Sequence, residues 1–541
     1  MVPSELKKPT AVSNQSISNK LICALQNPLL FDHPVKQFSV IETHISWVIL
    51  TGLFAYKIKK PVNLGFADFS TLDKRRYFCF EELRLNRRFA PDIYLSVVPI
   101  RGSHRQPDLG KVGEVIEYAV KMREFSQQNL LNNYVSEQQL KPAHIESLAD
   151  VVVALHRIAP AAKSGSLFGS VGTVTEWTRE NFEQIEAEIP RGLLPEYFES
   201  LKKWCLWSSD KRLSNMVKRQ AKGFVRECHG DLHLGNIAFI DGQITPFDCI
   251  EFNPSLRWID TTSEIAFVSM DLCAHDCPEF AWQFINRYLQ SGGDYAAIAL
   301  LRYYFVYRAM VRAKVEALRV TQKNFVTSHQ NQSYHAARHY MDLAQHWSTN
   351  QRPAVIIMHG LSASGKSTLA SELSRILGAI QIRSDVERKR IFGLDPEQNS
   401  GSTPGQNIYT QDATNRTYDH LQDLAKEIIL SDFTVIIDAS FLKLMHREQF
   451  RQFASKHGVP FLMLHCDASK DALRDRIVQR MESQHDPSEA NLSVLQHQLE
   501  SQQEITSNER NHVKIISSTE PILTPDKLHT LMLHIKPAKE T

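Results

Sequence analysis

Four polar residues in the middle of the chain have the types and the spacing needed to move a phosphoryl group. His229, Asp231 and Asn236 lie in the segment His-Gly-Asp-Leu-His-Leu-Gly-Asn, and Asp248 follows two short apolar runs. A carboxylate such as Asp231 can orient an attacking hydroxyl, while oxygens of Asn236 and Asp248 can hold Mg²⁺ on the phosphates of ATP. We therefore expect Asp231 to be catalytic and Asn236 and Asp248 to be metal ligands.

The residues after Asn236 are those of a tight β-hairpin. An apolar run is followed by Asp241–Gly242, a dipeptide that favours a two-residue turn, and a second short run ends at Asp248. Such a hairpin returns the chain to its starting point. We therefore expect Asp248 to lie beside the loop that carries Asp231.

The same loop resembles that of the aminoglycoside phosphotransferases, within the protein-kinase-like superfamily. Gly230 follows the histidine where protein kinases usually carry arginine. The resemblance implies a bilobal α+β domain that binds ATP and Mg²⁺. It leaves the acceptor open, because related kinases act on many different hydroxyl compounds and fold does not determine substrate.

Two β-prone runs, 44–50 and 53–58, predict an earlier hairpin. On the second run Ala55 and Lys57 share a face, as in the Ala-x-Lys of the third kinase strand, so the resemblance implies that Lys57 holds the α- and β-phosphates. Lys59 lies on that face too and is the alternative. No G-x-G-x-x-G precedes these lysines, a departure that favours the aminoglycoside-type branch.

A helix expected over residues 71–89 places Glu82, or its neighbour Glu81, to pair with the strand lysine. Two further strands are expected at 93–100 and 112–120, the second running into a hinge near Glu117–Val120 whose backbone could bind adenine. From residue 146 onward the pattern is mostly helical, as expected for the large lobe of such a domain.

A second nucleotide motif follows a polar linker near residue 348. An apolar strand at 354–358 precedes Gly-Leu-Ser-Ala-Ser-Gly-Lys-Ser-Thr, which matches G-x-x-x-x-G-K-[ST] with a helix after it. Backbone N–H groups of such a loop surround phosphate, the lysine reaches the β- and γ-phosphates, and the first hydroxyl binds Mg²⁺. The expected nucleotide-binding residues are Gly360, Ser364, Gly365, Lys366, Ser367 and Thr368, with Ser367 also a metal ligand.

Two acidic residues end later strands of this segment. Asp438 follows a buried run and is expected to act on Mg²⁺, whereas Asp385 follows another run and is our candidate for the acceptor hydroxyl, with a helix N-cap as the alternative. Arg388 could bind an anionic substrate. Arg474 lies on a helix resembling the lid of nucleoside-monophosphate-type kinases, and a solvated charged helix is the alternative there.

Composition sets the remaining limits. The 541 residues suit two or three domains, and 43% hydrophobic with 23% charged residues is typical of globular proteins. A net charge of +2 does not favour a polyanion-binding surface, and eight scattered cysteines do not form a disulfide framework. The N-terminus lacks an apolar signal core, and no run approaches membrane-spanning length, so we expect a cytoplasmic protein without a membrane partner.

We interpret the chain as an aminoglycoside phosphotransferase-like domain over residues 1–347, followed by a parallel-sheet P-loop domain over 348–541 that resembles gluconate and polynucleotide kinases. The expected activity is ATP-dependent phosphoryl transfer to hydroxyl groups of small molecules, with the two sites acting independently. Three alternatives stay open: a 5′-hydroxyl kinase for nucleic acid in the second domain, a regulatory module in which one domain senses ATP without turnover, and a switch in which the second domain hydrolyses ATP to drive motion. Oligomeric state stays open as well.

Overall fold

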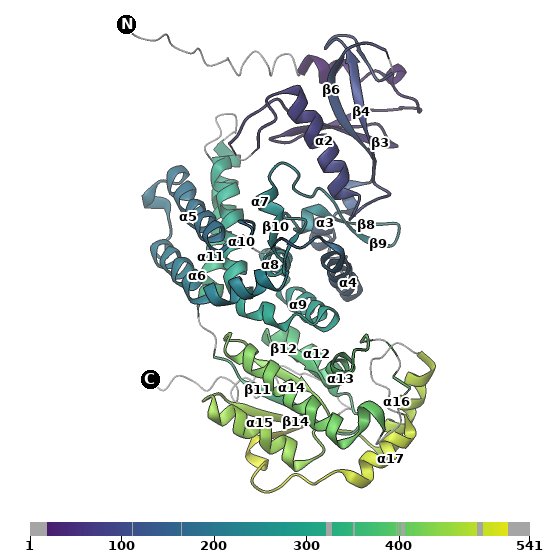
Figure 1. Cartoon of the computed structure of the whole chain (residues 1–541), viewed down its shortest axis with the longest axis vertical. Coiled ribbons are helices and arrows are strands. Elements are labelled where there is room, and N and C mark those ends of the chain that lie inside the picture. Colours follow the sequence, from purple (N-terminus) through teal and green to yellow (C-terminus); the bar gives the residue numbers. More distant parts are fainter. Residues whose placement is uncertain are drawn as a thin grey trace. The chain divides into compact units, whose positions relative to one another are not determined.

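Figure 1 shows a computed structural model that describes residues 19–65, 67–110, 112–163, 165–320, 327–349, 352–396, 398, 400–401, 406–483 and 491–517. The chain divides into two compact units. Unit 1 lies within the ranges Met1–Leu140, Leu155–Gly169 and Gly223–Asp260, and unit 2 within Lys141–Ala154, Ser170–Lys222 and Thr261–Thr541. The boundary expected after residue 347 falls at the end of helix α11 (Thr327–Ser348), inside unit 2. The glycines and the proline of residues 401–405 predict a loop, and most of this segment lies outside the described residues.

Unit 1 contains a six-stranded antiparallel sheet with the strand order β1-β2-β3-β6-β4-β5. Its strands are β1 (Ser39–Glu42), β2 (Ser46–Leu50), β3 (Phe54–Lys59), β4 (Tyr94–Gly102), β5 (Pro107–Asp108) and β6 (Val115–Arg123). The predicted hairpin at 44–58 is confirmed, because β2 and β3 pair around the turn at Thr51 and Gly52. Lys57 and Lys59 therefore project from a central strand of the sheet.

Helix α2 (Leu72–Asn86) crosses this sheet (Figure 1). The Thr71 hydroxyl caps its first turn by accepting from the Lys74 N–H, at 3.3 Å. Cys79, Glu82 and Leu85 recur at helical spacing and are buried. Their shared face points a carboxylate into the core, where it needs cationic partners.

The part of unit 1 that surrounds Asp231 is built from short elements. These are helix α3 (Leu131–Ser136), the strand pair β7 (Val225–Glu227) with β10 (Trp258–Asp260), the hairpin β8 (Ile237–Ile240) with β9 (Gln243–Pro246), and helix α7 (Pro254–Arg257). Gly230 has φ +87°, and a Cβ there would meet Leu256 O at 2.8 Å. Only glycine fits both the conformation and the space, which explains the glycine after His229.

Unit 2 begins with a helical group. Helix α4 (Pro142–Ile158) crosses from unit 2 into unit 1, and the other helices are α5 (Val171–Glu188), α6 (Phe198–Ala221), α8 (Thr261–Ala274), α9 (Pro278–Gly292), α10 (Ile298–Val320) and α11. Nearly all of α8 is buried, and α10 packs against α5, α6, α8 and α11. The tyrosines of α10, among them Tyr303 and Tyr304, are core residues, as their helical spacing indicates.

The rest of unit 2 is a five-stranded parallel sheet with the order β12-β13-β11-β14-β15 and helices packed against it (Figure 1). The predicted parallel sheet is thus confirmed. Its strands are β11 (Val355–His359), β12 (Ile380–Arg383), β13 (Val435–Asp438), β14 (Phe461–Asp467) and β15 (Val513–Ser517). Its helices are α12 (Lys366–Leu377), α13 (Ser384–Ile391), α14 (Gln411–Ile429), α15 (Leu444–Lys456), α16 (Lys470–Ser483) and α17 (Leu492–Ser501).

Arg447 of α15 is 1% exposed and joins distant parts of this sheet domain. Its Nε donates to Glu509 Oε1 at 2.6 Å, and Nη2 donates to the Glu504 carbonyl at 2.9 Å.

Arg447→Met leaves a buried carboxylate without its cation, so we expect the free energy of unfolding to fall by about 3–5 kcal/mol in a urea titration. The control is Arg451→Met on the same helix. Arg451 forms a surface pair with Glu448, so its loss should cost less than about 1 kcal/mol. Equal effects of the two changes would contradict the structural role of Arg447.

Candidate active sites

The first candidate site is the loop that ends in the β8–β9 hairpin. Asp241 and Gly242 have φ of 52° and 80°, the left-handed pair that a two-residue turn requires. Ile237 pairs with Pro246, and the Phe247 N–H donates to the Asn236 carbonyl at 3.0 Å. The next residue is Asp248. The hairpin therefore returns Asp248 beside Asn236, as its turn residues predict.

Asp231 has a partly exposed carboxylate held by its own loop. Asn236 Nδ2 donates to Asp231 Oδ2 and to its carbonyl, both at 3.0 Å, and His233 Nε2 lies 3.5 Å from Oδ2. The Asp231 side chain remains 39% exposed. His229 is buried, with Nε2 at 2.7 Å from the Phe247 carbonyl, so it joins the loop to the returning strand. These bonds orient Asp231 and leave it open to a substrate.

Asp248 adopts a left-handed conformation, with φ +62°, and its N–H donates to the Tyr94 hydroxyl at 3.1 Å. This turn brings the carboxylate back toward β3, where Oδ1 contacts Lys57 Nζ. The Asp248 side chain is 42% exposed. The amide oxygen of Asn236 and the carboxylate of Asp248 are hard oxygen donors of the kind Mg²⁺ binds.

Lys57 and Lys59 both reach Glu82, as two residues on one face of a strand can. Lys57 Nζ lies 2.8 Å from Glu82 Oε1, and Lys59 Nζ lies 2.7 Å from Oε2. The expected strand–helix ion pair is present, and Glu82 forms it. Glu81 points elsewhere because adjacent helical residues are about 100° apart around the axis.

The two lysines differ in what else they contact. Lys57 also contacts Asp248, the expected metal ligand, whereas Lys59 contacts Glu251 and is only 1% exposed. Burial lowers the pKa of Lys57, but Asp248 and Glu82 outweigh it and raise this pKa well above its usual range. Lys57 is therefore a permanent cation next to the expected metal site, and Lys59 is enclosed by protein.

Burial also acts on the carboxylates of this cluster. It raises the pKa of Glu82, but Lys57 and Lys59 lower it more strongly, and the resulting pKa is about 2. The pKa of Glu251 is raised, because burial outweighs the attraction of Lys59. Glu82 is thus the firmly ionised member that holds both lysines.

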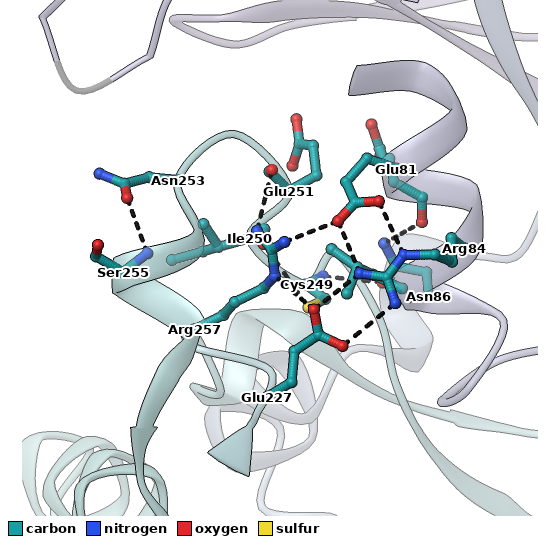
Figure 2. Close-up of polar contacts among 12 residues, drawn as sticks. Glu81, Arg84, Asn86, Glu227, Cys249, Ile250, Glu251, Asn253, Ser255 and Arg257 are labelled. Atoms are coloured by element: carbon teal, nitrogen blue, oxygen red, sulfur yellow. Dashed lines mark hydrogen bonds and ion pairs between the residues drawn. The ribbon is translucent and has the colours of Figure 1, made fainter. Parts of the chain in front are cut away.

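A second group of charges lies behind this cluster and is drawn in Figure 2. Arg257 Nη2 donates to Glu81 at 2.7 Å, Nε donates to Glu227 at 3.2 Å, and Nη1 donates to the Glu251 carbonyl at 3.2 Å. Arg84 bridges Glu81 and Glu227 as well, at 2.7 and 2.8 Å. Nη1 also donates to the Ile250 carbonyl at 3.5 Å. Arg257 is 3% exposed, so one planar guanidinium serves four acceptors in the interior. It fixes α2 to the segment that follows Asp248.

The prediction of a hinge near Glu117–Val120 is wrong. These residues lie inside β6, where Val120 pairs with both Lys57 and Val97, and Glu117 binds Arg75 at 2.8 Å. The β-favouring run continues to Arg123, so the strand ends later than predicted. Glu124 follows it and accepts the N–H groups of Thr51 and Gly52, at 2.9 and 2.8 Å, in the turn before Lys57.

The second candidate site lies at the carboxyl ends of β12, β13 and β11. The loop from Gly360 to Gly365 follows β11, and Gly365 is the N-cap of α12 with φ +92°. Lys366 Nζ donates to the Leu361 carbonyl at 2.6 Å, so the lysine folds back over the loop. Ser364 is buried. Lys366 and Ser367 begin the helix whose N-terminus favours phosphate.

Asp438 ends β13 and is 5% exposed. Burial raises its pKa, while Arg383 and a hydrogen bond with Ser367 lower it to a smaller extent. Gln381 Nε2 donates to Asp438 Oδ2 at 3.2 Å, and Arg383 Nε lies 3.7 Å from the same oxygen. The structure therefore brings Ser367 and Asp438 together, as expected for two groups acting on one metal ion.

The remaining predicted residues of this site occupy different environments. Asp385 is half-buried in the first turn of α13 and is not its N-cap, which is Arg383. Arg388 is buried and donates to the Ile408 carbonyl at 2.8 Å. Thr368 and Arg474 are exposed. Two residues beyond Arg474 on α16, Arg476 donates to the Ala363 carbonyl of the phosphate loop at 3.2 Å.

Comparison with known proteins separates the same two parts of the chain. Residues 80–301 match the model of the phosphotransferase enzyme family, and residues 355–505 match that of an AAA domain. The chain joins a phosphotransferase domain to a P-loop domain. The activity is accordingly of the kinase-type phosphotransferase class. Lys57 and Lys59 lie before the matched part of the phosphotransferase domain.

Curated relatives match most of the length of this chain. Uncharacterized proteins of Mycobacterium tuberculosis and Mycobacterium bovis are 27% identical over 454 residues, covering 83% of this chain and 88% of theirs. Among solved structures, an amicoumacin kinase with AMP-PNP, Ca²⁺ and its ligand is 14% identical, with TM-score 0.40 over 62% of this chain and 96% of its own. A gluconokinase from Sinorhizobium meliloti is 21% identical, with TM-score 0.23 over 32% and 86%. Neither likeness bears on the substrate of this chain.

Several polar residues of the two sites were not singled out from sequence. Arg257 and Glu227 in the phosphotransferase domain, and Gln381 in the P-loop domain, depend on partners far along the chain. Only the position of Gln381 within an apolar strand could have drawn attention to it, because a buried polar side chain needs a partner. Among the described residues, no helix combines the length and the apolar character that crossing a membrane requires.

The depressed pKa of Glu82 has a consequence for acid stability. Since its pKa is about 2 in the folded chain and 4.5 ordinarily, its contribution is complete above pH 4.5 and is lost as the pH falls toward 2. We expect Glu82→Gln to destabilise the phosphotransferase domain most at about pH 6. The difference in the free energy of unfolding between the variant and wild type, called the gap below, should narrow steadily toward about pH 3. Urea titrations across this range would measure the gap. Glu42→Gln, which removes a 57% exposed carboxylate from the same sheet, is the control and should change little at either pH. A gap for Glu82→Gln that stays constant with pH would contradict the assignment.

Proposed function

We propose that the chain is an ATP-dependent phosphotransferase with two nucleotide sites, one within residues 1–347 and one within 348–541, each transferring the γ-phosphate to a hydroxyl group of a small molecule. The observation that carries this proposal is the convergence of Asp231, Asn236 and Asp248 in one loop with the Lys57–Glu82 pair. Phosphoryl transfer needs a positioned acceptor, a metal ion and cations on the phosphates. This set contains a carboxylate to position the acceptor, oxygen ligands for the metal ion and a lysine for the phosphates.

In the first site Asp231 orients the acceptor hydroxyl and takes its proton. Asn236 uses Nδ2 to fix Asp231, which leaves its Oδ1 as the atom that can bind metal. Asp248 supplies the second oxygen ligand, and bound Mg²⁺ would neutralise charge on the transferred phosphate. Lys57 exchanges its contact with Asp248 for the α- and β-phosphates, while Glu82 keeps its position.

In the second site the loop from Gly360 to Gly365 surrounds the phosphates with backbone N–H groups. Lys366 begins α12 and its Nζ donates to the Leu361 carbonyl of the loop, and we expect it to reach the β- and γ-phosphates of a bound nucleotide. Ser367 and Asp438 hold Mg²⁺, and Asp385 receives the acceptor hydroxyl. Arg476, which already contacts the loop, is placed to approach the phosphates together with Arg474.

The acceptors are proposed to be small molecules for a reason of charge. A protein that binds a polynucleotide neutralises many phosphates at once, and a net charge of +2 over 541 residues provides no general excess of cations. Transfer to a 5′-hydroxyl oligonucleotide, or binding of ATP without transfer, is therefore an outcome that the assay must distinguish.

The two strand lysines are expected to respond differently to the same substitution. Lys57→Met should reduce phosphoryl transfer by roughly 100-fold or more without unfolding the domain, because it removes a cation aimed at the phosphates. Lys59→Met should mainly reduce the free energy of unfolding, by about 3 kcal/mol or more, because the lysine is enclosed between Glu82 and Glu251. Steady-state kinetics and urea titrations of both variants would measure this. The reverse result would assign the phosphate to Lys59.

The decisive assay is transfer from γ-labelled ATP by the full chain to a panel of aminoglycosides, sugars, sugar acids, nucleosides and 5′-hydroxyl oligonucleotides. Asp231→Ala should lower first-site transfer by roughly 100-fold or more and leave second-site transfer unchanged. Lys366→Ala should do the opposite. If either variant silences both activities, the sites are coupled and our proposal of independent sites is wrong. Nucleotide binding without transfer to any acceptor would instead favour an ATP-binding switch.

A further inference from the structure

Helix α9 of the phosphotransferase domain contacts the P-loop domain at β12 and α12, and all of these elements belong to unit 2. The contact centres on Asn286, which is 4% exposed. Asn286 lies within the matched range 80–301, whereas β12 lies within 355–505. Buried amides are retained where their hydrogen bonds are satisfied, so the partners of Asn286 define what it does.

Both amide atoms of Asn286 bind the backbone of β12. Nδ2 donates to the Ala379 carbonyl at 3.0 Å, and Oδ1 accepts the Gln381 N–H at 2.7 Å. Since β12 stands at one end of the strand order, these groups would otherwise lack a neighbouring strand. A side-chain amide therefore replaces one residue of a strand and fixes the position of Gln381.

Gln381 carries this connection into the second active site. It is 1% exposed, and its Nε2 donates to Asp438 Oδ2 at 3.2 Å while Oε1 accepts from Ser371 Oγ at 3.0 Å. Gln381 and Arg383 share a face of β12, and both approach the same oxygen of Asp438. The orientation of the Asp438 carboxylate thus depends on β12, which Asn286 holds.

The contacts around Asn286 show that α9 packs closely against the segment between α12 and β12. Gly378 ends α12 with φ +64°, and a Cβ there would meet the Trp282 ring at 2.9 Å. Trp282 in turn stacks on Trp347 and meets Phe433 edge to face. Trp282 and Asn286 are one helical turn apart on α9, so the helix presents an aromatic ring and an amide to the P-loop domain together.

We propose that Asn286 and Gln381 are positioning residues of the P-loop site, through which a helix of the phosphotransferase domain sets the orientation of the Asp438 carboxylate toward Mg²⁺. This inference rests on the proposed nucleotide site of the P-loop domain. Groups that hydrogen-bond a metal-binding carboxylate typically change metal affinity by 10- to 100-fold when removed. Binding of nucleotide without metal depends on the phosphate loop and is not expected to change.

The test uses the full chain carrying Lys57→Met, so that binding reports the P-loop site, and follows a fluorescent ATP analogue while Mg²⁺ is titrated. Asn286→Leu and Gln381→Met should each weaken the apparent Mg²⁺ affinity by about 10-fold or more, with metal-free analogue binding unchanged. Asn286→Asp keeps the acceptor for the Gln381 N–H and should lie between wild type and Asn286→Leu. Gln283→Leu is the matched control, because Gln283 lies on the same helix and binds Glu146 instead.

The possible outcomes separate this inference from the proposed function. If Lys366→Ala in the same background does not reduce analogue binding, the P-loop site itself fails and the inference fails with it. If that control succeeds but the Mg²⁺ titrations of Asn286→Leu and Gln381→Met coincide with wild type, the inference alone is overturned. Should Asn286→Leu unfold, Gln381→Met and Asn286→Asp decide the question, since both keep the size of the original side chain close to native.

Discussion

Two lysines that share one buried glutamate determine the arrangement of the first site. Glu82 pairs with both Lys57 and Lys59, and each lysine has a second carboxylate partner, Asp248 and Glu251 respectively. The two lysines keep Glu82 ionised in the interior, where an unpaired carboxylate would be costly. The sheet, helix α2 and the segment from Asp248 to Glu251 must each supply one part of this cluster. The cluster is therefore complete only where all three parts of the domain have come together.

Behind this cluster, Arg257 connects the helix that carries Glu82 with the segment that carries Asp248. Its three donor directions are all used, so the helix has little freedom to swing away from the site. Kinases that are regulated often move this helix to break the lysine–glutamate pair. In this chain Lys59 and Asp248 also contact the Lys57–Glu82 pair, and Arg257 holds helix α2. The pair is therefore already formed in the structure without a ligand.

Sequence reasoning succeeded where chemistry and spacing are local. Asp231, Asn236 and Asp248 could be placed together because a two-residue turn joins them, and the phosphate loop because strand, glycines and helix are contiguous. It was undecided between Lys57 and Lys59, since alternate strand residues share a face and only the distant partners Asp248 and Glu251 separate them. It misplaced the hinge because the β-favouring run in β6 continues beyond it.

Residues whose role depends on another part of the chain could not be found in this way. Asn286 and Gln381 carry no motif, and their meaning appears only when α9 lies against β12. The same applies to Arg257, which is one arginine among many until its acceptors are known. Motifs identified what each site contains, whereas tertiary contacts identified what holds it in place.

The packing of β12 against α9 also has a consequence for folding during synthesis. Synthesis runs from the N-terminus and domains generally fold in that order, so α9 leaves the ribosome before β12 and can pack first. The P-loop sheet then completes its folding against a surface that already exists, with Asn286 ready to receive the backbone of the end strand. A chain cut between the two domains would lose that template, and β12 would present its open backbone groups to other molecules during folding.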